Sequence, residues 1–132
     1  MAMTRNVTSA SELFNLMNEN GLVKDLNRLY FEGEMANSAK AQEELEAWIN
    51  KNNITLGGQK LTKDNIEIHE GGNNFNIMIK AGNVGLVMQF GMRPQAVDEA
   101  MQFLTSTTRP KWLAEQYDQH IYDGQSQFLI LN

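Results

Sequence analysis

The apolar residues of this chain of 132 residues change their spacing twice along the sequence. From Leu13 to Ile49 they recur every three or four residues, which is the period of a helix with one buried face. From Ile66 to Phe90 they alternate with other residues, which is the period of a strand with one buried side. After Pro94 the helical spacing returns. This order predicts an α+β fold in which helices cover one face of a sheet.

Three helical stretches are expected before residue 53. Ser9 and Glu12 form a capping-box pattern, so the first helix should begin there. Gly21 either ends that helix or kinks a longer one, and Asn53 ends the third. The apolar stripes are Leu13, Phe14, Leu16 and Met17; then Leu22, Val23, Leu26, Leu29 and Tyr30; then Ala41, Leu45, Trp48 and Ile49.

Antiparallel strands are expected after the third helix. A short hairpin is predicted over 54–61, and three strands should form a meander over 66–90. The turn signal Asp123-Gly124 predicts a second hairpin with a terminal strand over 127–131. A fourth helix over 96–104 and a short one over 112–117 should lie between these strands. The sheet therefore has about four or five strands, the meander 66–90 plus the C-terminal strand, with helices on one face.

Size and composition favour one globular domain, 1–132. Hydrophobic residues make up 42% of the chain and charged residues 20%, which is ordinary for a folded protein. No apolar run approaches the roughly 20 residues that cross a bilayer, and the first ten residues do not resemble a signal peptide. The chain has no cysteine, which excludes disulfides and thiolate sites and agrees with a reducing compartment. We expect a cytoplasmic protein.

The net charge of −5 argues against nucleic acid as a partner, because phosphate binding requires a basic face. Acidic residues gather over 32–46, where five glutamates accompany one lysine. Two interpretations are open. Glu43, Glu44 and Glu46 either form a solvated helix face or bind a partner protein with a basic surface.

Candidate chemistry is confined to few residues. Glu67 and His69 should lie on one face of a strand, where they could supply a general base or half of a metal site. If the terminal hairpin pairs beside the meander, His120 could complete a His-His-carboxylate set. The simpler interpretation is an exposed strand histidine beside a carboxylate. No catalytic or nucleotide-binding motif occurs, so we expect no metal and no cofactor.

The second face of the meander carries Met78 and Val87 among polar residues and glycine. Methionine adapts its shape to different surfaces, so this face is a candidate site for a partner or for a second copy of the chain. The alternative is that the last helix or the terminal strand covers it.

For function, these features favour a non-enzymatic, acidic protein-binding module of a bacterium or its phage, such as an inhibitor, an immunity-type protein or a chaperone. The order of elements is similar to that of the acidic secretion chaperones, but with a longer helical start and no closing helix. The alternative is a small enzyme or ligand-binding cone, similar in form to steroid-isomerase-like folds. There Tyr30, Trp48, His69 and Trp112 would line an apolar pocket.

Overall fold

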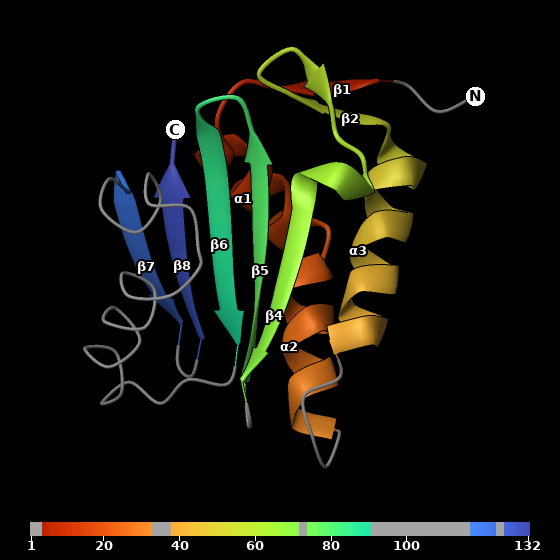
Figure 1. The fold of residues 1–132 in the computed structure, drawn as a ribbon, viewed down its shortest axis with the longest axis vertical. Helices are drawn as coiled ribbons and strands as arrows, with labels where there is room; N and C mark the ends of the chain where they lie inside the picture. The colour runs from red at the N-terminus through yellow and green to blue at the C-terminus, as the bar shows by residue number, and fades with distance from the viewer. Residues whose placement is uncertain (1–3, 33–37, 72–73, 91–116, 124–125) are drawn as a thin grey trace.

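The computed structural model describes residues 4–32, 38–71, 74–90, 117–123 and 126–132 (Figure 1). These residues form three α-helices, one 3-10 turn and strands in two sheets. The helices are α1 (Ala10–Glu19), α2 (Leu22–Glu32) and α3 (Ser38–Asn52), and the turn is Lys63–Asn65. The strands are β1 (Arg5–Val7), β2 (Ile54–Leu56), β3 (Gln59–Lys60), β4 (Ile66–Gly71), β5 (Asn74–Ala81), β6 (Val84–Phe90), β7 (Gln119–Asp123) and β8 (Ser126–Leu131).

The larger sheet has five antiparallel strands in the order β4-β5-β6-β8-β7. The first three are the predicted meander, and the predicted terminal strand pairs with β6. The two-residue turn between β5 and β6 contains Gly82 at φ 61°, a conformation that glycine adopts without a steric cost. The predicted fold class is therefore confirmed.

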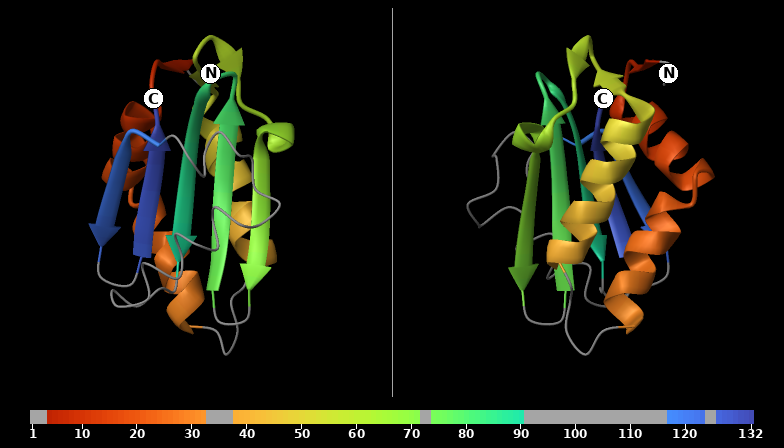
Figure 2. Two further views of the ribbon diagram at one scale, coloured as in Figure 1. Left: turned by 60° about the vertical axis from the view of Figure 1, so that its left-hand side comes forward. Right: turned by 90° about the vertical axis from the view of Figure 1, so that its right-hand side faces the viewer.

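All three helices lie on one face of this sheet, as both views in Figure 2 show. Their apolar stripes meet the alternate residues of the strands in one cluster, which includes Leu26, Leu45 and Leu86, each fully buried. Phe128 of β8 contacts Phe14 of α1 with ring centroids 4.7 Å apart. Burial of this apolar surface is the main stabilising contribution to the fold.

The smaller sheet, β1-β2-β3, lies at one end of the larger one (Figure 1). The predicted hairpin forms β2 and β3, and its turn glycines, Gly57 and Gly58, have positive φ. Strand β1 was not predicted. It is three residues long, and it pairs in parallel with β2, so that Arg5 lies opposite Ile54. Strands that pair across so long a separation in sequence leave no local pattern that would predict the pairing.

The start of α1 follows the predicted capping box with one change. Ser9 Oγ accepts a hydrogen bond from Glu12 N at 3.1 Å, as expected. The Glu12 carboxylate reaches back to Thr8, one residue beyond the expected partner. Gly21, at φ 77°, separates α1 and α2 into two helices, which settles the alternative in favour of the break.

The predicted helices over 96–104 and 112–116 lie outside the described residues. Tyr117 is described and stands just before β7, without helical structure. Among the described helices, none combines the length and the apolar character that crossing a membrane would require.

Candidate functional site

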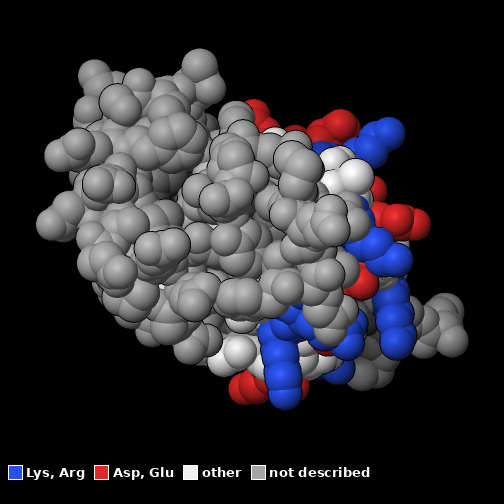
Figure 3. All heavy atoms as spheres, turned by 90° about the horizontal axis from the view of Figure 1, so that it is seen from below, with Lys and Arg blue, Asp and Glu red and all other residues white. Residues whose placement is uncertain are grey.

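The three glutamates proposed for partner binding lie on α3 but share no single face. Glu44 and Glu46 stand on either side of Leu45, which is buried, and consecutive helix residues are turned by about 100°. Their carboxylates therefore point to opposite flanks of the helix, while Glu43 is exposed on the side away from the core. Lys40, four residues before Glu44, is its neighbour on the helix surface. Figure 3 likewise shows acidic and basic side chains interspersed over the described part of the lower face.

Met78 and Val87 are buried, with exposed fractions of 4% and 0%. They form a second apolar cluster with Leu129, against which Tyr117 and Leu131 pack. This cluster lies on the face of the five-stranded sheet opposite to the helices. A partner cannot reach these two side chains in this conformation. Their role in binding stays a prediction.

The hypothetical His-His-carboxylate set is wrong, because the two histidines belong to opposite edges of the five-stranded sheet. His69 is in β4 and His120 in β7, with three strands between them. Four strand spacings of about 4.8 Å place their backbones roughly 19 Å apart. The terminal hairpin does pair beside the meander, but it joins β6 and not β4, the strand that carries Glu67. Among the described residues, no three acidic or histidine side chains converge on a possible metal position.

A polar row that the sequence analysis missed crosses the second face. The register aligns one hydrogen-bonding side chain from each of the three central strands, in the order Asn76, Gln89 and Gln127. Asn76, Gln89 and Gln127 are each 1% exposed. Asn76 Nδ2 donates to Gln89 Oε1 at 2.9 Å, and Gln127 Oε1 lies 2.7 Å from His120 Nε2. The alternation of the strands contained this signal, but only the register brings the three residues together.

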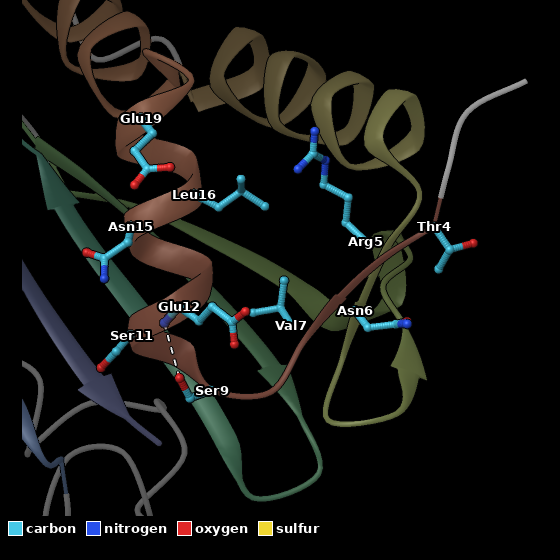
Figure 4. Close-up of a pocket in the computed structure, with 10 residues that line it drawn as sticks. All are labelled: Thr4, Arg5, Asn6, Val7, Ser9, Ser11, Glu12, Asn15, Leu16 and Glu19. Atoms are coloured by element: carbon cyan, nitrogen blue, oxygen red, sulfur yellow. Dashed lines mark hydrogen bonds between the residues drawn. The ribbon is translucent and has the colours of Figure 1, made fainter.

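A groove with a volume of about 720 Å³ runs between β1 and α1. Its walls carry Arg5, Asn6 and Val7 from β1 and Glu12, Leu16 and Glu19 from α1. Figure 4 shows Glu12 and Leu16 pointing to the side of α1 on which β1 lies. Sites for drug-sized ligands span about 300 to 1,000 Å³, so the groove is large enough for a peptide segment.

The backbone of β1 presents one unpaired edge to this groove. Arg5 N donates to Asn53 O at 3.1 Å, and Val7 O accepts from Gly57 N at 2.9 Å. Residues 5 and 7 therefore direct their backbone groups to β2, and the intervening Asn6 directs its N–H and C=O the other way. Since β1 is the end strand of its sheet, no described strand meets Asn6 on that side.

The charge along the groove is mainly negative. Glu12 Oε2 accepts hydrogen bonds from Thr8 N at 3.0 Å and from Thr8 Oγ1 at 2.8 Å. The backbone bond first, and the hydroxyl bond second, hold the pKa of the Glu12 carboxyl below its usual value. Glu19 adds a second, exposed carboxylate, and Arg5 supplies one positive charge.

The residues proposed to line a pocket in the cone-like alternative are only partly described. Trp48 is half-buried and packs against the main core cluster. Its indole Nε1 is buried without a hydrogen-bond partner among the described residues. Trp112 and the side chains of Tyr30 and His69 lie outside the described part of the structure.

Neither models of protein families, nor curated proteins, nor solved structures give a match to this chain. Among the described residues, the groove beside β1 brings together unpaired backbone groups, a cavity and charged side chains.

Proposed function

We propose that this chain is a non-enzymatic protein-binding module that receives an extended segment of a partner protein along β1. The observation that carries this proposal is the unpaired N–H and C=O of Asn6, which face a groove between β1 and α1. An extended peptide can add to such an edge as a further strand, with backbone hydrogen bonds supplying affinity. This mode of binding is compatible with an inhibitor, an immunity-type protein or a chaperone.

The walls of the groove suit a peptide. Strand addition leaves alternate side chains of the peptide on one face, where they can contact the groove wall. Leu16, half-buried on α1, offers an apolar contact to such a side chain. Helix α1 is held in place by Leu13 and Met17, both fully buried, so this wall is rigid before the partner arrives.

The test compares Asn6→Pro with Asn6→Ala. Both variants lose the hydrogen bond that Asn6 Oδ1 accepts from Thr55 Oγ1 at 2.6 Å. This loss therefore cannot explain a difference between them. Only proline also removes the N–H that faces the groove, and an edge position tolerates proline because the bonds to β2 belong to Arg5 and Val7. Thermal unfolding of both variants checks that each is folded.

A displayed library of random seven-residue segments serves as the probe. We expect selection on the wild-type protein to enrich segments that bind the alanine variant and fail to bind the proline variant. Failure to enrich any segment would contradict the proposal, as would equal binding to the two variants.

A further inference from the structure

We infer that the segment bound along β1 is basic, with lysine or arginine side chains that reach Glu12 and Glu19 of α1. This inference rests on the proposed function and adds the chemical class of the partner. It depends on where the two carboxylates lie. Their positions are an observation separate from the unpaired edge of β1.

The two carboxylates lie on the same side of α1. Seven residues are almost two full turns, so Glu12 and Glu19 point in nearly the same direction and are about 10 Å apart along the helix axis. Both border the groove. In an extended segment, residues two apart place their side chains on one face at about 7 Å, and residues four apart at about 13 Å. Flexible lysine side chains at either spacing can reach both carboxylates.

The hydrogen bonds of the Glu12 carboxylate favour its interaction with a cation. Both hydrogen bonds from Thr8 reach Oε2, and Oε1 makes no hydrogen bond to the described residues. The same two bonds favour the ionised form and fix the orientation of the carboxylate. Arg5, the one cation among the groove residues named above, points away from Glu12 in Figure 4. An ammonium or guanidinium group therefore meets a negative charge there, while an acidic segment is repelled.

Three blocked peptides test the inference by fluorescence anisotropy. The first is Thr-Lys-Val-Lys-Val-Lys-Thr, and the other two carry serine or glutamate in place of every lysine. We expect the lysine peptide to bind most tightly, the serine peptide more weakly and the glutamate peptide least.

The decisive variant is Glu12→Gln combined with Glu19→Gln. Glutamine can still accept the bonds from Thr8, so the helix start is preserved while the charge is removed. The lysine peptide should lose about three- to tenfold in affinity, as expected for two exposed ion pairs, and the serine peptide should be unaffected. Asp25→Asn with Asp64→Asn, two exposed carboxylates that do not line the groove, removes the same net charge and should leave both affinities unchanged.

The outcomes separate this inference from the proposed function. Equal binding of the serine and lysine peptides, both sensitive to Asn6→Pro, would overturn the basic partner and retain strand addition. A matched loss in the Asp25 and Asp64 variant would also overturn it, because the effect would then follow net charge alone. Binding of the lysine peptide that survives Asn6→Pro would overturn the proposed function itself, and absence of binding by all three peptides would overturn both.

Discussion

The two sheets of this protein differ in how completely their strands are paired and buried. In the five-stranded sheet, the middle strands are paired on both sides and both faces are buried, so neighbouring residues such as Leu86 and Val87 are each fully buried. In the three-stranded sheet, β1 is short and exposes Arg5 and Asn6, and no described strand pairs with its outer edge. The larger sheet therefore contributes most of the buried core, while the smaller sheet leaves the backbone groups that the proposed strand addition requires.

The two faces of the larger sheet are buried in different ways. The face toward the helices is apolar, whereas the opposite face contains the polar row with Asn76 and Gln89. Buried amides are costly unless they are hydrogen-bonded, and these two satisfy each other in part through a bond of 2.9 Å. A slip of one residue in register would place these amides against the apolar core, so the row favours a single register.

The largest effect should come from the centre of the helix-facing core. Leu86→Ala leaves a cavity at a fully buried position and should lower the free energy of unfolding by about 2 to 5 kcal/mol. Urea denaturation measures this change. A loss under about 1 kcal/mol would mean that the larger sheet does not dominate stability.

The polar row should come next. Gln89→Leu removes the acceptor of Asn76 Nδ2 and should cost about 1 to 3 kcal/mol, since a buried donor is left without a partner. Adding Asn76→Leu should restore part of this loss, because both polar groups are then gone. Urea unfolding of the single and double variants gives the coupling, and strictly additive losses would show that the two amides do not act together.

A smaller effect is expected where α1 meets the three-stranded sheet. Ser9→Ala removes the hydroxyl that caps the helix and should cost about 1 kcal/mol in thermal unfolding. Ser11→Ala is the matched control, because Ser11 Oγ is buried and has no hydrogen-bond partner among the described residues. An equal loss of stability in both variants would show that the Ser9 hydroxyl does not cap the helix.

The smallest effect on stability should come from α3. Replacing Glu43, Glu44 and Glu46 by glutamine should change the free energy of unfolding by less than about 0.5 kcal/mol. If these carboxylates steer a basic partner, the lysine peptide should associate more slowly, with a weaker dependence on salt. Stopped-flow measurements at low salt decide this, and an unchanged rate would leave the three residues as a solvated helix face.

How well each region can be predicted depends on how far apart in the sequence its interacting residues are. The meander was predictable because its alternation is local, and the turn at Gly82 sets which residues of β5 and β6 face each other. The polar row requires the register of β5, β6 and β8, and β8 pairs with β6 across a long stretch of sequence. Strand β1, with two polar residues of three, is defined by its pairing with β2, so the groove that depends on it could not be found from the sequence.

The central claim is that β1 accepts a strand at Asn6, and amide hydrogen exchange by NMR tests it most directly. In the free protein, the Asn6 N–H should exchange faster than those of Arg5 and Val7, which face β2. Saturation with the lysine peptide should slow exchange at Asn6 and leave its two neighbours little changed. Exchange at Asn6 that stays as fast in the complex as in the free protein would contradict strand addition at β1.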